Sequence, residues 1–451
     1  MKEESNQQNS QKAIEGRQKK RCEMNSRERL QQLQRKLYLK AKQAPEYKFY
    51  ILYDKVFLDY VLKESYRIVK SRGGGAGIDN VGFQEIEAIG LESYLSEIAD
   101  QLRSRRYRPA AIKRVWIAKA TGGRRPLGIP TIRDRIVQAA CKLIIEPIFE
   151  ADFEDSSYGF RPKRSAHGAI KAIKRHLQSG KSEVYDADLR GYFDSIPHDK
   201  LLKVLSERIS DKRILWLIKL WLKAPVYEDG NYSSGKKRKA GTPQGGVLSP
   251  LLANIYLHLL DRIVNNPKSV FARYGIELIR YADDFILMGH LIPEMVLNRL
   301  HELLRRMGLR LNPEKSKRVN AKESPFDFLG YTVRYDRSIY DTRKRFWHIK
   351  PSEASQRRMR QSINMLLKRI GHYGPDDVVR SLNERLRGWL NYYDIPGVSY
   401  TKIARRKLNW YMRHRLNRYY NRKSQRKSRL YRQQAFKILV DKYGLIDPLY
   451  C

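Results

Sequence analysis

The sequence has 451 residues, 41% of them hydrophobic, which is enough to bury the cores of roughly two or three packed units and excludes a disordered chain. It carries 90 Lys and Arg against 48 Asp and Glu, and the formal net charge of +42 favours nucleic acid as partner over an anionic membrane surface. No apolar run of about 18 residues could span a bilayer, residues 1–21 lack a secretory hydrophobic segment, and the three scattered cysteines fit neither disulfides nor a zinc site. We therefore expect a reducing, intracellular compartment.

The N-terminal part of the chain is predicted to be helical after a polar start. Residues 1–46 form a basic extension with a flexible beginning. A glycine-rich stretch at residues 71–77 is a helix breaker. Apolar residues at helical spacing predict three helices in this part: one through Leu30, Leu33 and Leu37, one across residues 47–69, and one around residues 84–103.

The central part is predicted to alternate strands and helices. Residues 114–118 and 126–130 indicate a β-hairpin around the turn Gly122-Gly123. The further elements follow in this order: a helix at 134–148, a strand at 182–188, helices from about 199 to 223, a strand–turn–strand unit at 277–289, a helix at 296–307 closed by Gly308, and a second hairpin from 326–333 and 346–350.

The C-terminal part, from about residue 352 to 443, is predicted to be mostly helical and is very basic. Residues 401–440 contain fourteen Lys and Arg and no Asp or Glu. A charge run is usually a solvated helix face, but one this long without an acid favours RNA or DNA as partner. Strands alternating with helices, followed by a helical tail, predict an α+β fold with a helical appendage.

Two segments place acidic residues where a basic protein has little reason to keep them. Asp186 and Asp188 share one face of the predicted strand, and Asp283-Asp284 lie inside the apolar hairpin 277–289. Buried carboxylates need a partner charge or a metal ion. Hard cations such as Mg²⁺ bind carboxylates, and nucleotidyl transfer uses two such ions about 3.5–4 Å apart. An Asp-Asp pair alone is more often a polar hairpin turn, so the interpretation depends on accompanying motifs.

Such motifs occur in order between about residues 33 and 391. They are Gly77-Ile78-Asp79, Arg125-Pro126-Leu127-Gly128-Ile129-Pro130-Thr131, Ser157-Tyr158-Gly159-Phe160-Arg161-Pro162, Asp188-Leu189-Arg190-Gly191-Tyr192-Phe193-Asp194, Gly241-Thr242-Pro243-Gln244-Gly245-Gly246, Tyr281-Ala282-Asp283-Asp284 and Phe328-Leu329-Gly330. With them the chain resembles the reverse transcriptase and maturase proteins encoded by bacterial group II introns.

The resemblance implies a right-hand polymerase with fingers, a palm with an antiparallel sheet, and a helical thumb or X domain. It implies that Asp188 and Asp283 are the main metal ligands, that Asp284 is the third carboxylate, and that the carbonyl of Leu189 completes a metal shell. Two Mg²⁺ ions are expected, with Mn²⁺ as a possible substitute. Asp186 has no such role in the family, and a structural role is expected for it.

Two cations at the tip of the first hairpin are candidates for binding the triphosphate. Lys119 and Arg125 flank the Gly122-Gly123 turn, and arginine suits bidentate phosphate contacts while lysine supplies a point charge. Ala118 stands where the family usually has proline, which weakens the assignment of Lys119. Arg124 remains an alternative, and simple solvation of these side chains remains open.

Three further residues are expected to contact the nucleotide. The resemblance makes Phe193 the gate that excludes a 2′-hydroxyl, with a core phenylalanine as the alternative. Gln244 lies in a glycine-rich loop where the backbone approaches a ligand closely and an amide can bond to a base or sugar edge, although a helix cap is also possible. Lys315 is a candidate to protonate the leaving pyrophosphate, but Lys317 is nearby and a solvated lysine is equally plausible.

Four other features complete the expectations. Residues 328–330 resemble the segment that grips the primer, and His167 is expected to be structural or to contact phosphate. Residues 388–393 resemble the end of the thumb, where Trp389 is expected in the core. Relatives often carry a C-terminal HNH endonuclease with paired cysteines, and a lone Cys451 predicts that this domain is absent.

The resemblance divides the chain into five segments: a basic extension at 1–46, N-terminal helices and fingers at 47–180, a palm with embedded fingers elements at 181–350, a thumb or maturase (X) domain at 351–400, and a basic RNA- or DNA-binding end at 401–451. The expected function is RNA-directed DNA polymerisation, with intron RNA binding that assists splicing and retrohoming. The expected partners are intron RNA, an RNA template with a DNA primer, target DNA and dNTPs, in the bacterial cytoplasm and without a membrane; monomer and dimer both remain open.

The expected function has two alternatives. The chain could be a reverse transcriptase adopted for host defence or diversity generation, which a missing intron ribozyme around the gene would favour. It could instead be an RNA-binding splicing factor without polymerase activity. Decayed members of that kind lose the catalytic aspartates, whereas Asp188, Asp283 and Asp284 are all present here.

Overall fold

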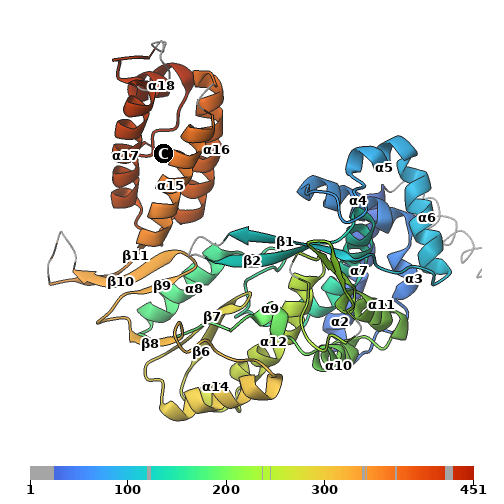
Figure 1. Ribbon diagram of the computed structural model, residues 1–451. Helices are drawn as coiled ribbons and strands as arrows, with labels where there is room; N and C mark the ends of the chain where they lie inside the picture. Colours follow the sequence, from blue (N-terminus) through green and yellow to red (C-terminus); the bar gives the residue numbers. More distant parts are fainter. Residues whose placement is uncertain are drawn as a thin grey trace, which may run out of the picture.

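The computed structural model describes residues 25–118, 123–235, 237–243, 245–337, 341, 343–370, 373–421 and 430–450. It is a mixed helix-and-sheet molecule, as predicted. Helices from the N-terminal part lie at one end, three β-sheets occupy the middle, and a helical bundle stands at the other end (Figure 1). We call these sheets the fingers sheet, the palm sheet and the β9–β11 sheet, and we call the bundle the thumb.

The N-terminal part contains α2 (Ser26–Gln43), α3 (Tyr53–Val56), α4 (Asp59–Arg72), α5 (Phe83–Ile89), α6 (Leu91–Arg103) and α7 (Ile132–Glu150). The helices α2, α3 and α4 pack against the long buried helix α7, and α6 packs against α4 and α5. The helix α2 begins with a capping box between Asn25 and Glu28 and buries Leu30 and Leu37 in the core. The part of the predicted extension that the structure describes therefore belongs to the packed body. The predictions at 47–69 and 84–103 each correspond to two helices, and Gly90 at φ +104° separates the second pair.

The fingers sheet has the strand order β2-β1-β4-β5. Its strands are β1 (Ile112–Ala118), β2 (Arg124–Ile129), β4 (Val226–Glu228) and β5 (Asn231–Ser233). The predicted hairpin is the antiparallel pair β1–β2. The sequence analysis missed β4 and β5, because three-residue strands carry too little alternation to be recognised and β4 pairs in parallel with distant β1 at Ile112 and Val226.

The palm sheet has the order β6-β7-β3-β8, with every pair antiparallel. Its strands are β3 (Glu183–Ala187), β6 (Glu277–Tyr281), β7 (Asp284–Gly289) and β8 (Lys317–Asn320). Alternate side chains belong to different cores: Tyr185 and Leu287 join the core that includes α12 (Ser249–Asn265) and α14 (Glu294–Met307), whereas Val184 and Ile286 join the core that includes α8 (Ala166–Gln178).

The remaining helices of the central part are α9 (Tyr192–Ser195), α10 (His198–Arg208), α11 (Lys212–Leu222) and α13 (Val270–Arg273), and both α10 and α11 bury leucines in the core. The predicted end of α14 is confirmed, because Gly308 follows the helix in the left-handed conformation.

The β9–β11 sheet connects the palm to the thumb. Its strands are β9 (Phe326–Phe328), β10 (Tyr331–Arg337) and β11 (Arg345–Pro351), in the order β11-β10-β9. The segment predicted as one strand at 326–333 is split by Leu329 and Gly330, both at positive φ.

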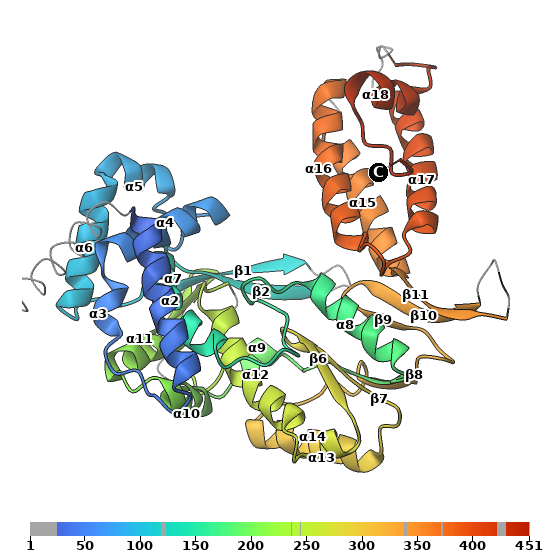
Figure 2. The same cartoon turned by 180° about the vertical axis from the view of Figure 1, so that it is seen from behind.

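The thumb consists of α15 (Glu353–Arg369), α16 (Pro375–Tyr393), α17 (Lys402–Asn421) and α18 (Ala435–Tyr443). The views from both sides show it standing beyond the β9–β11 sheet, away from the N-terminal helices (Figures 1 and 2). Ile363, Leu386 and Met412 are buried among its helices, and Trp389 is buried as expected.

Candidate active site

Two adjacent strands of the palm sheet bring the three aspartates together. The pairing of β3 with β7 ends at Ala187 and Phe285, so the next residue on each strand, Asp188 and Asp284, continues the same register. Tyr281 pairs with Asp284, which leaves Asp283 in the tight turn between β6 and β7. Directly opposed residues of antiparallel strands project to the same face. The carboxylates thus converge at one open end of the sheet.

The turn that carries Asp283 has a constrained backbone. Ala282 has φ +60°, a left-handed conformation that costs a non-glycine residue roughly 1–2 kcal/mol. The backbone of the Ser157–Gly159 segment packs directly on it: the amide of Tyr158 donates to the carbonyl of Arg280 at 2.8 Å. A Cβ on Gly159 would lie 2.2 Å from the amide nitrogen of Ala282, so only glycine permits this approach.

Burial and neighbouring negative charge raise the pKa of both aspartates of the turn, Asp283 and Asp284. Burial raises the pKa of Asp283, and the charge of Asp188 adds to this, while Arg125 and Arg280 oppose it. Burial also raises the pKa of Asp284 to about 6, with further contributions from the charges of Asp283 and Asp188. Because the Asp284 side chain is accessible to solvent, this desolvation comes from the protein walls around it rather than from complete burial. Crowded, repelling carboxylates of this kind create a demand for a cation.

The donor set fits divalent ions that are completed by substrate. Among the described residues, no three His, Cys, Asp or Glu side chains are arranged as a preformed metal cage. Mg²⁺ rarely uses such cages, since it binds one or two carboxylates together with waters and substrate phosphates. Leu189 opposes Leu311, and the backbone bonds of this pair are made by the flanking residues: the amide of Asn312 donates to the backbone carbonyl of Asp188 at 2.8 Å, and the amide of Arg190 donates to the carbonyl of Arg310 at 2.9 Å. The carbonyl of Leu189 consequently points away from that strand and is available as a ligand.

The fingers hairpin separates the two candidate arginines. Arg125 pairs with Ile117 and Arg124 with Ala118, so their side chains project from opposite faces of β2. Both are exposed, and the charge of Arg125 lowers the pKa of Asp283, which agrees with a side chain that faces the carboxylates. Lys119 lies outside the described residues.

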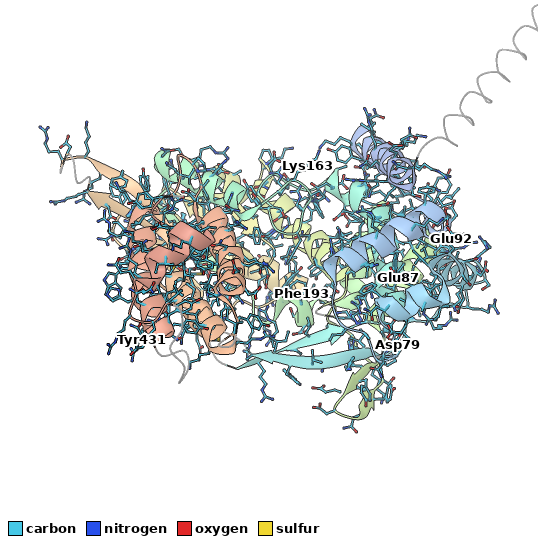
Figure 3. The ribbon with its side chains drawn as sticks, turned by 90° about the horizontal axis from the view of Figure 1, so that it is seen from above. Asp79, Glu87, Glu92, Lys163, Phe193 and Tyr431 are labelled. Carbon is cyan, nitrogen blue, oxygen red and sulfur yellow. The ribbon has the colours of Figure 1, made fainter. Side chains whose placement is uncertain are left out.

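Phe193 lies close to the chain segment that precedes Gln244. It is half-buried at the start of α9, and its carbonyl accepts from the amide of Thr242 at 2.7 Å. Seen from above, Phe193 lies between the thumb and the N-terminal helices (Figure 3). Gln244 is outside the described residues. Its neighbour Gly245 packs against the fingers, where a Cβ would lie 2.2 Å from the carbonyl oxygen of Gly128.

The two candidate lysines lie beside different aspartates. Lys315 Nζ lies 3.5 Å from Asp188 Oδ2, with its side chain 65% exposed. Lys317 pairs across the sheet with Asp186, and burial raises the pKa of Asp186 to about 6 while Lys317 opposes the shift. The geometry therefore favours Lys315 over Lys317 as the cation of the aspartate cluster.

His167 and the predicted primer-grip segment meet at the junction of palm and thumb. His167 Nε2 lies 2.7 Å from the carbonyl oxygen of Tyr392, and the hydroxyl of Tyr392 donates to the carbonyl of Leu329 at 3.0 Å. The structural role expected for His167 is consistent with this contact. The turn at Leu329 is thereby attached to α16.

Comparison with known proteins agrees with this geometry. A family model described as reverse transcriptase (RNA-dependent DNA polymerase) matches residues 117–333, and one for the group II intron maturase-specific domain matches residues 356–437. Protein YkfC of Escherichia coli (strain K12) is 35% identical over 347 residues, which cover 69% of this chain and 90% of YkfC. The chain belongs to the bacterial group II intron reverse transcriptase/maturase family. The molecule accordingly has the right-hand fold of an RNA-directed DNA polymerase.

Other relatives of this reverse transcriptase are longer. The group II intron-encoded protein LtrA of Lactococcus lactis subsp. cremoris is 42% identical over 205 residues, which cover 45% of this chain and 34% of LtrA. A 91 kDa protein in the cob intron of Schizosaccharomyces pombe is 28% identical over 433 residues, 78% of this chain and 52% of that protein. The chain thus spans about a third to a half of these two relatives. Reverse transcriptases of this family act with divalent metal ions and bind intron RNA and other nucleic acid.

The sequence analysis missed Arg280, which lies directly behind the Asp283 turn of the reverse transcriptase. Its side chain is completely buried. The signal available in the sequence was an arginine in the middle of an otherwise apolar strand, since a buried charge requires specific partners.

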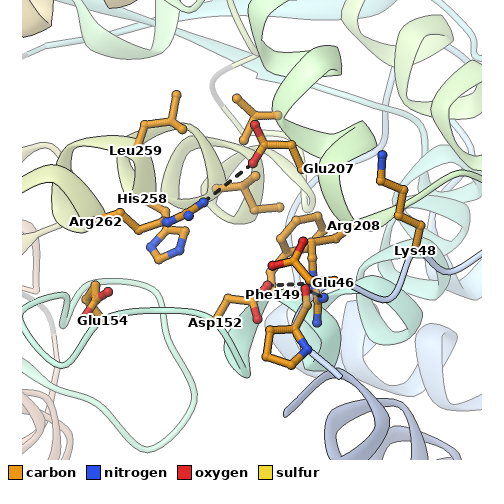
Figure 4. A pocket seen from close by; sticks show the side chains of 13 residues that line it. Glu46, Lys48, Phe149, Asp152, Glu154, Glu207, Arg208, His258, Leu259 and Arg262 are labelled. Atoms are coloured by element: carbon orange, nitrogen blue, oxygen red, sulfur yellow. Dashed lines mark hydrogen bonds and ion pairs between the residues drawn. The ribbon is translucent and has the colours of Figure 1, made fainter. Parts of the chain in front are cut away.

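A separate cavity of about 460 Å³ lies between the Pro45–Lys48 segment, α7, α10 and α12, and none of the three aspartates lines it (Figure 4). Arg208 is paired there with Asp152 at 2.9 Å, and Arg262 with Glu207 at 3.7 Å. Burial lowers the pKa of His258 to about 4, so this ring is neutral at physiological pH. Two of the arginines that line the cavity are thus paired with carboxylates, and the cavity lies apart from the three aspartates of the candidate active site. No helix in the described parts of the chain has the length and apolar character needed to cross a membrane.

Proposed function

We propose that this reverse transcriptase extends a DNA primer on an RNA template by two-metal-ion nucleotidyl transfer. Asp188 and Asp283 hold two Mg²⁺ ions, for which Mn²⁺ can substitute, and Asp284 and the carbonyl of Leu189 complete the protein ligands. When bound, the ions activate the 3′-hydroxyl and neutralise the triphosphate. The convergence of the three carboxylates at one end of the palm sheet is the observation that carries the proposal.

The remaining site residues bind and orient the nucleotide. The primer 3′-hydroxyl releases its proton to solvent and its oxygen forms a bond to the α-phosphorus, while the bond from the α-phosphorus to the bridging oxygen breaks and pyrophosphate leaves. Arg125, with Lys119, binds the triphosphate from the fingers, and Lys315 donates a proton to the departing pyrophosphate. Phe193 lies beneath the sugar and excludes a 2′-hydroxyl, and Gln244 bonds to the nucleotide from its loop.

A primer-extension assay with an RNA template, a DNA primer, dNTPs and Mg²⁺ tests this proposal. Wild type should make cDNA. Asp283→Ala should be slower by about 10³-fold, because several kcal/mol of metal-dependent transition-state stabilisation is lost, while RNA binding is retained. A wild type that makes no cDNA, or an Asp283→Ala variant as fast as wild type, contradicts the polymerase mechanism and favours a splicing factor that only binds RNA.

We further propose that the thumb binds the parent intron RNA during splicing, and target DNA during retrohoming, in the bacterial cytoplasm. The outer face of α17 supports this. Trp410 is 62% exposed, its ring centre lies 4.1 Å from that of the tilted His414 ring, and exposed cations such as Arg406 and Lys407 lie on the same helix. Exposed aromatic rings among cations suit base stacking and phosphate contacts. Tighter binding of the parent intron than of an unrelated RNA of equal length would support the assignment, and equal binding would contradict it.

A further inference from the structure

The guanidinium of Arg280 is enclosed in a fully bonded network behind the Asp283 turn. Nε and Nη2 donate to the two carboxylate oxygens of Asp261 at 2.8 and 2.5 Å, Nη1 donates to Asn254 Oδ1 at 2.9 Å, and Nη2 also donates to Ser157 Oγ at 2.7 Å. The last donor, on Nη1, bonds to the carbonyl of Ala282 at 2.8 Å. All five N–H groups of the arginine are therefore used.

Helix α12 supplies both side chains that hold the arginine from one side. Asn254 and Asp261 are seven residues apart, two helical turns, and so lie on the same face of α12. Asp261 is completely buried, and Asn254 also donates to the carbonyl of Gly159 at 2.7 Å. The same network thus reaches both backbone segments that form the turn region, the one at Gly159 and the one at Ala282.

The bond to Ala282 connects this network to the chemistry. Ala282 immediately precedes Asp283 and holds a left-handed backbone conformation that its own side chain disfavours. Such a conformation persists only where surrounding contacts impose it. We infer that Arg280, held by Asp261 and Asn254, is a positioning residue that fixes the carboxylate of Asp283 for metal binding.

This inference rests on the proposed function, because it assumes that Asp283 is a metal ligand. A purely structural role for Arg280 predicts a less stable protein with an unchanged metal site. A positioning role predicts weaker metal binding even where the protein remains folded. Groups that orient metal ligands typically change metal affinity or activity about 10–100-fold when they are removed.

The test uses the double variant Arg280→Met/Asp261→Leu, which replaces the buried ion pair by apolar side chains and leaves neither charge alone. Mn²⁺ binding is measured by electron paramagnetic resonance on the full chain with an RNA template, a primer lacking its 3′-hydroxyl and a matching dNTP, so that no chemistry occurs. We expect a folded protein with Mn²⁺ binding weakened about 10–100-fold. In single-nucleotide addition, kcat should fall while the KM for primer–template stays within about twofold.

The matched control is Arg208→Met/Asp152→Leu, which removes a second arginine–aspartate pair, with Arg208 buried and Asp152 half-buried, whose described bonds do not involve Arg280 or the Asp283 turn. This variant should retain wild-type Mn²⁺ binding. Ser157→Ala removes one acceptor of Arg280 without leaving a charge unpaired, and it decides the question if the double variant does not fold. For Ser157→Ala we expect Mn²⁺ binding to weaken by at least about threefold. This effect is smaller than that of Arg280→Met/Asp261→Leu because only one hydrogen bond of Arg280 is lost.

Wild-type Mn²⁺ binding in a folded Arg280→Met/Asp261→Leu variant, or in Ser157→Ala if that double variant does not fold, would overturn the positioning role. Failure of the proposed function has a different signature: wild type itself would neither bind Mn²⁺ in this complex nor extend the primer.

Discussion

The palm and the thumb use positive charge in opposite ways. In the palm, Arg280 is completely buried and each of its donors has one assigned acceptor. On the outer face of the thumb, Lys402, Arg406 and Lys407 are exposed along one side of α17, with no acidic residue on that helix. The buried charge of the palm fixes the positions of particular atoms through hydrogen bonds. The exposed charges of the thumb create a positive electrostatic potential that attracts phosphates in general. Single substitutions should therefore be severe in the palm and graded in the thumb.

Among the residues expected to contact the nucleotide, the largest effect on the KM for dNTP is expected at Arg125, and its neighbour Arg124 serves as the control. Arg125→Ala should raise the KM for dNTP about 10–100-fold, because charge-assisted hydrogen bonds to phosphate are lost. Arg124→Ala, which removes the same charge from the opposite face of β2, should change this KM by less than about threefold. Steady-state single-nucleotide addition measures both. Equal effects would mean that the triphosphate does not discriminate between the faces of the fingers hairpin.

A smaller effect is expected for thumb cations. Replacing Lys402, Arg406 and Lys407 by Gln should reduce the log–log salt slope of RNA binding by about 2–3, since each neutralised phosphate contributes roughly 0.7–0.9. Binding is measured by titration at several salt concentrations. The rate of primer extension at saturating primer–template should stay close to that of wild type.

A control triple variant removes three exposed cations from the palm, at Lys268, Arg273 and Arg305. It lowers the net charge by the same amount but should change the salt slope by less than about one unit. If both triple variants behave alike, the RNA responds to total charge, and the distinction between palm and thumb does not extend to binding.

The smallest expected effect concerns stability and pH. The pKa of Asp284 is raised from 3.8 to about 6, so ionising this group costs the folded state stability as the pH rises through that window. Without divalent metal, Asp284→Asn should raise the Tm by roughly 1–3 °C at pH 8, and this gain should vanish as the pH falls toward 4. Thermal melts in EDTA measure it. Mg²⁺ should remove the gain, and Asp155→Asn, at a carboxylate that is 94% exposed, should show none.

Local patterns predicted the parts of this molecule that local sequence determines. The strands around Asp283 were expected at 277–289 and occur at Glu277–Tyr281 and Asp284–Gly289, because apolar residues flank a short polar turn. The end of α14 followed from Gly308. The motif order indicated the family and the three aspartates, and the pairing of β3 with β7 gives their convergence a physical basis.

Features that depend on distant pairing could not be predicted. The strand β4 joins β1 through residues more than a hundred positions apart, and nothing in its short sequence indicates a partner. The choice between Arg124 and Arg125 required the strand register. The surroundings of Arg280 assemble from Ser157, Asn254 and Asp261, so an arginine in an apolar strand indicates a buried charge without identifying what holds it.

The residues that support the Asp283 turn belong to a different part of the chain from the thumb. Among the described contacts, Ser157, Gly159, Asn254 and Asp261 support the turn, and all of them precede the thumb in the chain. The thumb instead meets the palm through contacts such as that of His167 with Tyr392. Variation in the thumb sequence therefore leaves unchanged the residues that hold the Asp283 turn in place.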